Sequence, residues 1–490
     1  MSKKLPLILN VCDPGLTSNS KNQTKNQIFH NLSSHAKTVS TDMFNTQWHA
    51  LLGNYCPDVV YFSVLPSSKV NIESLKEMKN HYPNLLVVFT FTFSDETEAN
   101  IFSENILPYI DIVTSNMIDI NALVGASVDS KITELHLLLK MKHSSLSCHW
   151  LIQDGDFSVD TWTNWLLDQD SIVGFHSTYL FSDQRKKTGI QSETSDGLYS
   201  SFTCFLAHGY DVLDATTMAK AYTKSAALVG CPGWPLQIEN LPLITSCING
   251  DYSKKIQMLD SLKETGQQKT DQSFAKMDLD KMGLYPVVDT IDWLDLILKQ
   301  GVKIAQLRIK NPEDPYLENK IQKAIALGEK HNAQVFINDY WQQAILFGAY
   351  GVHLGQGDLD IADLSKIQQA GLRLGISTHG YYEIARAQNI QPSYIALGHI
   401  FPTQTKDMPS QPQGLNRLNH YARLLKGKVP TVAIGGISIE RFTDVAKTGV
   451  DSVAVVSAIT KADNPEEVTT LLLSKFNLVK AEQTKKSVSI

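Results

Sequence analysis

The chain has 490 residues, of which 43% are hydrophobic and 19% are charged, and its formal net charge at pH 7 is -6. A chain of this length is expected to form at least two domains, because single cores rarely grow beyond about 250–300 residues. The slightly acidic charge argues against nucleic acid or a membrane surface as a partner, and no apolar run approaches the roughly 18 residues that span a bilayer. The apolar run near the amino terminus is too short for a secretory signal, so we expect a cytoplasmic protein.

The first half of the chain alternates apolar runs of strand length with polar segments of helical period. The strand candidates are residues 5–11, 58–65, 84–93, 110–116 and 149–155. Residues 215–229, "ATTMAKAYTKSAALV", are typical of an amphipathic helix. This alternation predicts an α/β domain with a largely parallel sheet over residues 1–247.

A charged, glutamine-rich stretch separates the two halves. We interpret residues 248–281 as a helix and linker between two domains. All six cysteines lie before this stretch, and none of them forms a Cys-x-x-Cys pair. A zinc site is therefore not expected.

The second half alternates more regularly between strand-like and helix-like segments. Its eight strand candidates are residues 284–289, 303–309, 333–339, 350–355, 372–378, 393–400, 430–436 and 452–458. Eight βα units in roughly 200 residues predict a (β/α)8 TIM barrel over residues 282–478, followed by a tail at 479–490. In such barrels the active site lies at the carboxyl ends of the strands, so the residues at those ends are the candidates for function.

The second strand of the barrel ends in three large polar residues, Gln306, Arg308 and Lys310. They are two positions apart, so in a strand they share one face. On the inner face near the barrel mouth they would be costly without a ligand, and two cations favour an anionic one. The alternative is an outward face, where Arg and Lys are ordinary, but the pattern "IAQLRI" reserves the other face for apolar residues.

Two aspartates follow the next two strands, Asp339 at the end of the third and Asp358 after the fourth. Two such carboxylates can share a hard cation such as Mg²⁺ that bridges to a phosphate. Aspartate also caps helices, which is the plainer explanation for each residue alone. With Arg308 and Lys310 close by, a metal and a diphosphate become the better interpretation.

A second anion site is predicted where the last three strands end. After the sixth strand, "FPTQTK" contains Thr403, Gln404, Thr405 and Lys406, which are also compatible with an ordinary solvated turn. Gly435 and Gly436 follow the seventh strand, and Val456 and Ser457 follow the eighth, where backbone N–H groups can bind a phosphate. A diphosphate that leaves and a monophosphate that stays would fit these two sites. The reaction class would then be group transfer from a diphosphate to a phosphorylated acceptor.

The second half resembles thiamine-phosphate synthase. The matching stretches are "GLYPVVD", "QLRIK", "FINDYW", "GVHLGQGDL", "LGISTH", "PSYIALGHIFPTQTK", "PTVAIGGIS" and "VVSAIT", in order over residues 283–461. The resemblance implies joining of hydroxymethylpyrimidine diphosphate to a thiazole phosphate, giving thiamine phosphate and pyrophosphate. The pyrimidine C–O bond ionises first, and the thiazole nitrogen then attacks the methylene cation.

The resemblance also implies site residues. The pyrimidine diphosphate would be held by Gln306, Leu307, Arg308, Ile309, Lys310, Asn338, Ser377 and Lys406. The thiazole phosphate would be held by Thr403, Gln404, Thr405, Gly436, Val456 and Ser457. Asp339 and Asp358 would bind Mg²⁺, while Arg308, Lys310 and Lys406 stabilise the departing pyrophosphate. We assign no proton transfer to the strand-end residues His353, His379 and His399.

Two other functions are conceivable for the barrel. A thiazole tautomerase-like relative would share the fold without the pyrimidine-binding residues, but both aspartates and the cations of the second strand are present. A non-enzymatic sensor of the thiamine pathway would require an inactive barrel, which no site residue suggests. Small-molecule substrates are therefore the expected partners, and a homo-oligomer is compatible with this interpretation.

The first half resembles hydroxymethylpyrimidine phosphate kinase, of the ribokinase-like fold, most clearly in "LPYIDIVTSNMIDINALVG" at residues 107–125. Cys12 begins "CDPG", where that family has a substrate loop, but no run of glycines follows. Gln153 stands where the family has a phosphate-contacting lysine. Residues 193–196, Glu-Thr-Ser-Asp, replace a Gly-Thr-Gly-Cys anion hole, and a glutamate there would repel a phosphoryl group.

Three hypotheses follow for the first half. The favoured one is a degenerate kinase-like domain that binds a ligand, such as the pyrimidine, or supports the barrel. The second is an active kinase, with Asp196 as a base, which would make the protein bifunctional. The third is an unrelated fold.

Overall fold

The computed structural model describes residues 5–12, 20–63, 71–90, 101–116, 120, 148–153, 161–167, 171–178, 193–229, 237–248, 273–403 and 410–488, excluding the side chains of residues 20–24, 161–162, 178, 193–196, 226–229, 246–248 and 486–488. The chain divides into two compact units, Met1–Gln268 and Lys269–Ile490. The predicted helix within residues 248–272 and the site residues Gln404, Thr405 and Lys406 lie outside the described residues.

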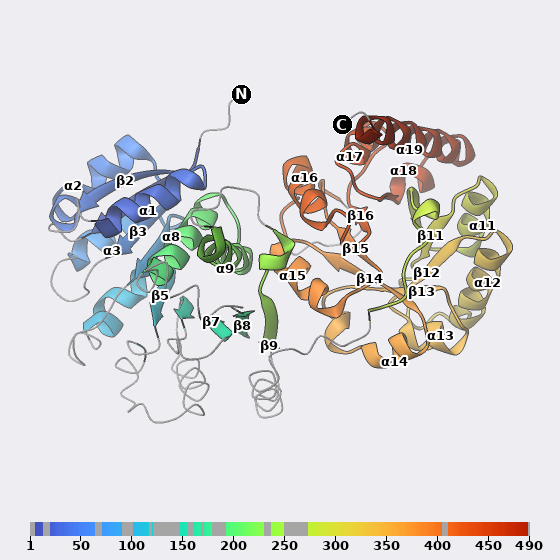
Figure 1. Ribbon diagram of the computed structural model, residues 1–490, viewed down its shortest axis with the longest axis horizontal. Coiled ribbons are helices and arrows are strands. Elements are labelled where there is room, and N and C mark those ends of the chain that lie inside the picture. Colours follow the sequence, from blue (N-terminus) through green and yellow to red (C-terminus); the bar gives the residue numbers. More distant parts are fainter. Residues whose placement is uncertain are drawn as a thin grey trace. The chain divides into compact units, whose positions relative to one another are not determined.

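The amino-terminal unit contains a sheet with the strand order β2-β1-β3-β4-β5-β6-β7-β8-β9 (Figure 1). The strands are β1 (Leu7–Cys12), β2 (His35–Ser40), β3 (Val59–Ser63), β4 (Leu86–Thr90), β5 (Ile112–Asn116), β6 (His149–Gln153), β7 (Thr161–Leu167), β8 (Ser171–Thr178) and β9 (Leu243–Ile248). The pairs from β2 to β6 are parallel, whereas those from β6 to β9 are antiparallel. The predicted α/β class is confirmed, and the predicted strands correspond to β1, β3, β4, β5 and β6.

Helices cover both faces of this sheet. α2 (Thr41–Tyr55) and α3 (Ile72–His81) pack on one face, where Phe44 and Leu75 belong to the same core cluster as Val60. α1 (Ser20–Asn31), α8 (Glu193–Ala207) and α9 (Val212–Val229) lie over the other face (Figure 1), and Tyr199 donates a hydrogen bond to the Ser115 carbonyl. Short helical turns span Phe102–Ile106, Leu107–Tyr109 and Ile238–Asn240.

A row of polar side chains crosses the face beneath α9. Asn116 on β5 pairs in register with Gln153 on β6, which lies opposite Asn164 on β7. Lys220 on α9 donates a hydrogen bond to Asn164 Oδ1. Gln153 is 2% exposed, and within the part of the chain that is described neither its amide nitrogen nor its amide oxygen has a hydrogen-bond partner. Unpaired buried amides are costly, so this row differs from an ordinary packed sheet face.

The carboxyl-terminal unit is a closed barrel of parallel strands, as predicted. Its strands are β10 (Leu284–Val288), β11 (Ile304–Leu307), β12 (Gln334–Asn338), β13 (Gly351–Leu354), β14 (Arg373–Thr378), β15 (Tyr394–Leu397), β16 (Thr431–Ala433) and β17 (Ser452–Val455), and β17 pairs with β10. The helices are α11 (Ile291–Lys299), α12 (Leu317–Lys330), α13 (Trp341–Leu346), α14 (Leu364–Gln369), α15 (Tyr381–Ile390), α16 (Gly414–Leu425), α17 (Phe442–Ala446), α18 (Ser457–Thr460) and α19 (Pro465–Val488). Single turns span Leu279–Lys281 and Asp358–Asp360.

Aromatic side chains fill the barrel interior. Tyr285, Phe336 and Tyr394 belong to one buried cluster, with ring centroids 5.0 to 6.4 Å apart. Gly375 on β14 makes room for Tyr394, because a Cβ atom at Gly375 would lie 2.2 Å from Tyr394 Cζ. In this part of the interior, a large side chain thus packs against a glycine on the neighbouring strand.

The segment before β10 packs against the barrel. Phe274 and Met277 are buried, and Met277 joins the interior cluster. The Phe274 N–H donates to the Gln391 carbonyl, and the Asp278 N–H donates to Gln334 Oε1. Residues 273–281, which we predicted as part of a linker, therefore belong structurally to the barrel unit. At the other end, α19 continues through the predicted tail to Val488.

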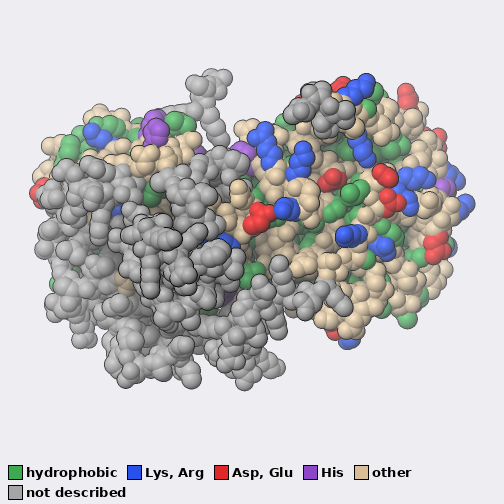
Figure 2. Space-filling model, in the orientation of Figure 1, with side chains coloured by type: hydrophobic (Ala, Val, Ile, Leu, Met, Phe, Trp, Pro, Cys, Tyr) green, Lys and Arg blue, Asp and Glu red, His purple; other side chains and the backbone are tan. Residues whose placement is uncertain are grey.

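The barrel surface carries charges of both signs. On the face seen in Figure 2, Lys and Arg side chains alternate with Asp and Glu side chains and form no continuous patch of one sign. Among the described helices, none is both long and apolar enough to cross a bilayer.

Candidate active site

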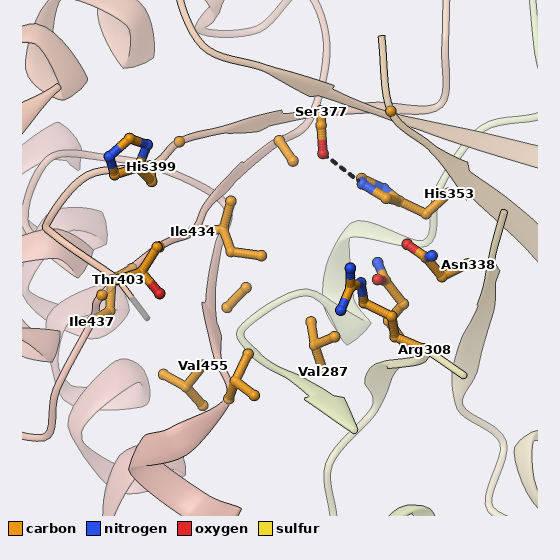
Figure 3. A pocket seen from close by; sticks show the side chains of 18 of the residues that line it. Val287, Arg308, Asn338, His353, Ser377, His399, Thr403, Ile434, Ile437 and Val455 are labelled. Carbon is orange, nitrogen blue, oxygen red and sulfur yellow. Dashed lines mark hydrogen bonds between the residues drawn. The ribbon is translucent and has the colours of Figure 1, made fainter. Parts of the chain in front are cut away.

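A cavity of about 270 Å³ opens at the carboxyl ends of the barrel strands. Every strand contributes to it, directly or through the residue that follows, and Figure 3 shows side chains converging from all around the ring. The lining residues are Val287, Gln306, Arg308, Asn338, Asp339, His353, Gly355, Asp358, Ser377, Thr378, His379, Ala396, Gly398, His399, Thr403, Ile434, Gly435, Gly436, Ile437, Ala454, Val455, Val456 and Ser457.

Arg308 and Asn338 lie on one side of the cavity (Figure 3), where Gln306 also lines it. Gln306 and Asn338 are 4% and 6% exposed, so their amides are held in a nearly dry environment. Lys310 is exposed and does not line the cavity, because β11 ends at Leu307 and the strand alternation persists only as far as Arg308. Leu307 and Ile309 are buried away from the cavity.

Asp339 and Asp358 line the same cavity. Asp339 has a left-handed backbone with φ of 66°, which directs the chain sharply out of β12 into α13. Asp358 Oδ2 accepts a hydrogen bond of 2.9 Å from the Gly355 N–H, which orients its carboxylate. Two carboxylates are a donor set that suits Mg²⁺, which commonly takes one or two of them and completes its shell with water and phosphate oxygens. The described residues contain no cluster of three or more such ligands.

Ser377 is fixed from two directions at the end of β14. Gln356 Nε2 donates to the Ser377 carbonyl at 2.7 Å, and His353 Nε2 lies 2.8 Å from Ser377 Oγ. His353 is 6% exposed and lines the cavity. From the sequence, His353 was considered for proton transfer and assigned none. Its contact with Ser377 was not foreseen, because the two residues lie on different strands.

The opposite side of the cavity is formed by backbone and small side chains. Thr403 lies there (Figure 3), and Gly435 and Gly436 also line the cavity. Both glycines have positive φ, and a Cβ atom at Gly436 would lie 2.4 Å from the Pro402 carbonyl oxygen. Ser457 begins α18, a helix of one turn. This side contains no Lys or Arg among the described lining residues, in contrast with the side that carries Arg308.

Two further histidines line the cavity. The side chain and the backbone N–H of His379 both contact Glu383 Oε2, at 2.8 and 2.7 Å. His399 is 5% exposed, and burial, followed by the nearby His379, lowers the pKa of its imidazole below the ordinary 6.5. Neither was assigned a role from the sequence.

Ten of the predicted site residues are therefore brought together in one cavity. They are Gln306, Arg308, Asn338, Asp339, Asp358, Ser377, Thr403, Gly436, Val456 and Ser457. The roles assigned to them remain predictions, as do those of Lys310 and of the residues outside the described part.

Comparisons with known proteins divide the chain in the same way. Residues 284–459 match the family described as thiamine monophosphate synthase, and residues 30–233 match the family described as phosphomethylpyrimidine kinase. The thiamine-phosphate synthase of Pectobacterium atrosepticum is 60% identical over 193 residues, which are 39% of this chain and 91% of that protein.

Two solved structures are similar to one half each. A thiamine phosphate pyrophosphorylase from Pyrococcus furiosus is 27% identical, with a TM-score of 0.37, over 41% of this chain and 98% of that one. The pyridoxal kinase from Staphylococcus aureus in complex with ADP is 14% identical, with a TM-score of 0.38, over 50% of this chain and 99% of that one. By the sequence matches, this chain belongs to the thiamine-phosphate synthase family and carries an amino-terminal domain of the phosphomethylpyrimidine kinase family.

Proposed function

We propose that the barrel joins hydroxymethylpyrimidine diphosphate to a thiazole phosphate and releases thiamine phosphate and pyrophosphate. The observation that carries this proposal is the division of one cavity into a polar, cationic side and a backbone-lined side. The sequence identity with a thiamine-phosphate synthase, 60% over 193 residues, supports the same conclusion.

The polar side suits the diphosphate that leaves. Arg308, with its fixed guanidinium fork, would bind phosphate oxygens, and Ser377 would donate a hydrogen bond. Asp339 and Asp358 would hold Mg²⁺, which supplies charge neutralisation for the pyrophosphate. When the C–O bond breaks, its electron pair goes to the diphosphate oxygen, and preorganised donors lower the free energy of that step.

The backbone-lined side suits the thiazole phosphate. Amide N–H groups near Gly436 and Ser457 would bind a monophosphate without a counter-ion, and Thr403 would add a hydroxyl. The thiazole nitrogen attacks through its own lone pair, so the reaction requires no general base.

The metal assignment is tested with Asp339→Asn, because asparagine tolerates the left-handed backbone while the charge is lost. We expect turnover to fall at least about 100-fold, since stabilisation of the leaving group is weakened. Calorimetry should show thiazole phosphate still binding. Asp360→Asn is the matched control, because Asp360 pairs with Arg386 at 2.5 Å and does not line the cavity. Equal turnover in the two variants would refute the metal assignment.

The division of the cavity is tested with Lys406→Ala and Thr403→Ala. If Lys406 serves the diphosphate, its loss should slow C–O ionisation, measured as a reduced kcat. Loss of Thr403 should mainly raise the KM for thiazole phosphate. A raised KM for thiazole phosphate in Lys406→Ala, with a reduced kcat in Thr403→Ala, would assign Lys406 to the thiazole phosphate and Thr403 to the diphosphate.

For the amino-terminal domain we infer binding of the pyrimidine or its phosphate without phosphoryl transfer. The observation that favours this is the polar row of half-buried Asn116 and buried Gln153, Asn164 and Lys220, in which the Gln153 amide stands at the position of the family's lysine. A neutral amide can bind a heterocycle or a phosphate but does not neutralise a transferring phosphoryl group.

This inference is tested on the full-length chain. Incubation with ATP and either hydroxymethylpyrimidine or its phosphate should give no release of ADP above background. Because the barrel also binds the pyrimidine, titration calorimetry should compare the parent with Gln153→Leu, which is expected to lose one of two binding events. Substrate-stimulated ADP release would establish the alternative, a bifunctional enzyme with an active kinase.

A further inference from the structure

A chain of hydrogen-bonded side chains runs from inside the barrel to the cavity. Gln306 Nε2 lies 3.4 Å from Tyr285 Oη, which lies 2.7 Å from Tyr394 Oη. Tyr394 Oη lies 2.7 Å from His353 Nδ1, and His353 Nε2 lies 2.8 Å from Ser377 Oγ. The chain thus joins five strands, and its last bond, from His353 to Ser377, is visible in Figure 3.

Both phenols of this chain keep their protons. Burial raises the pKa of Tyr285 and of Tyr394 well above the ordinary 10, so each keeps its proton and can donate one hydrogen bond. Gln306 Nε2 donates to Tyr285. Either phenol could donate in the bond between Tyr285 and Tyr394; we assign the Tyr285 proton to Tyr394 Oη, because Gln306 Nε2 is a donor and cannot accept it. The Tyr394 proton is then directed to His353 Nδ1.

The His353 imidazole connects the two tyrosines to Ser377 at the cavity. With Nδ1 accepting from Tyr394, the neutral ring of His353 carries its proton on Nε2 and donates it to Ser377 Oγ. One lone pair of the serine hydroxyl is then occupied, and its proton is left to point into the cavity. If the Gln306 amide were reversed, its oxygen would accept a hydrogen bond from Tyr285. Each later hydrogen bond would then have the opposite direction, and Ser377 would donate to His353.

We propose that His353 is a positioning residue that, held by Tyr394, makes the Ser377 hydroxyl a hydrogen-bond donor toward the departing diphosphate. Only the identity of that acceptor rests on the proposed function. The stacking of the His353 ring on Tyr394, with centroids 5.6 Å and planes 22° apart, holds the imidazole in this orientation. Tyr394 is held in turn by the space at Gly375.

The direction of the chain can be measured on the unmodified protein. Nitrogen-15 NMR of the histidine rings distinguishes the two tautomers, and the signal that disappears in His353→Gln belongs to this residue. We expect a protonated Nε2 and an unprotonated Nδ1. A protonated Nδ1 with an unprotonated Nε2 would overturn the proposal, whether or not the protein makes thiamine phosphate.

The functional part is tested by comparing His353→Leu in two backgrounds. In the parent, the loss of an oriented donor should reduce kcat by about 10- to 100-fold, with the KM for thiazole phosphate little changed. In Ser377→Ala the same substitution should have almost no further effect, because His353 acts through that hydroxyl. An equal reduction in both backgrounds would show a merely structural role.

A conservative variant provides the matched control. In His353→Gln the side-chain amide can place an N–H close to the position of the imidazole Nε2, so it should recover part of the kcat lost in His353→Leu. Activity in His353→Gln no higher than in His353→Leu would contradict donation to Ser377. If the parent itself makes no thiamine phosphate, the proposed function fails, while the tautomer measurement still decides the direction of the chain.

Discussion

Gly436 is a residue whose lack of a side chain shapes the cavity. Its φ is 65°, and a Cβ atom there would lie 2.4 Å from the Pro402 carbonyl oxygen. Gly436→Ala should therefore displace the backbone next to Thr403 and raise the KM for thiazole phosphate roughly tenfold, equivalent to about 1.4 kcal/mol. Steady-state kinetics with varied thiazole phosphate measures this change.

Gly427→Ala separates the contact from the backbone strain. Gly427 has a φ of 73°, but a Cβ atom there would have no neighbour within 4 Å, so alanine meets only the left-handed penalty of about 1–2 kcal/mol. Gly436→Ala should lose more stability in urea unfolding than Gly427→Ala, because it adds a backbone clash to the left-handed penalty, and only Gly436→Ala should lose binding. A raised KM in Gly427→Ala would attribute the effect to general destabilisation.

The sequence predicted individual cavity residues where regular strand geometry extends to the strand end. Gln306 on β11 and Arg308, the first residue after it, follow the strand alternation and line the cavity, whereas Lys310, three residues beyond the strand end, is exposed. The position of His353 could not be predicted in this way, because its partner Tyr394 is 41 residues away in the sequence. A contact of that kind depends on barrel closure and leaves no local pattern.

At the level of elements, a buried histidine, His399, follows β15, and a half-buried one, His420, lies on α16. Burial lowers the pKa of His399 and of His420 below the ordinary 6.5. Below that pH the unfolded chain binds more protons than the folded one, so stability falls as the pH is lowered from about 6.5. The unfolding free energy of the barrel should therefore decrease between pH 7.5 and 5.5.

Substitution shows whether these histidines cause the decrease. In a His399→Gln, His420→Gln double variant, the slope of unfolding free energy against pH should be shallower over the same range. Denaturant unfolding at several pH values gives this slope. An unchanged slope would assign the acid sensitivity to other groups. Asp295 and Asp363 do not interfere, because hydrogen bonds from Lys299 and from the Lys366 N–H respectively lower their pKa values below the ordinary 3.8.

The strands of the barrel were easier to predict from the sequence than those of the amino-terminal unit. All eight barrel strands were predicted, because a buried parallel strand is a short apolar run between amphipathic helices. In the amino-terminal unit, β2 was missed because "HAKTVS" is half-exposed and mostly polar at the sheet edge. β7 was missed because its "TWTNWLL" mixes polar and apolar residues without a helical partner to mark its boundaries.

At the scale of the whole molecule, the boundary of the barrel unit can be tested by fragments. The family match begins at residue 284, but Phe274 and Met277 are buried against the barrel. A fragment beginning at residue 273 should therefore be more stable than one beginning at residue 283. Loss of two buried apolar side chains removes about 3–6 kcal/mol of burial free energy.

Thermal and urea unfolding of the two fragments measure this difference. The fragment beginning at 273 should also retain the synthase activity of the full chain, because every described cavity residue lies within it. If the two fragments were equally stable, residues 273–281 would contribute nothing to the barrel and would be a linker, as their composition predicted. Loss of activity in the longer fragment would show that the barrel depends on the amino-terminal unit.

The fit between Gly375 and Tyr394 also limits how this barrel can evolve. Any side chain at position 375 would overlap the Tyr394 ring, so the glycine can change only after the tyrosine has become smaller. A smaller residue at 394 would in turn remove the hydrogen-bond partner of His353. Substitution of Gly375 is thereby linked to the hydrogen bond between Tyr394 and His353. Descendants that retain Tyr394 are expected to retain Gly375 as well.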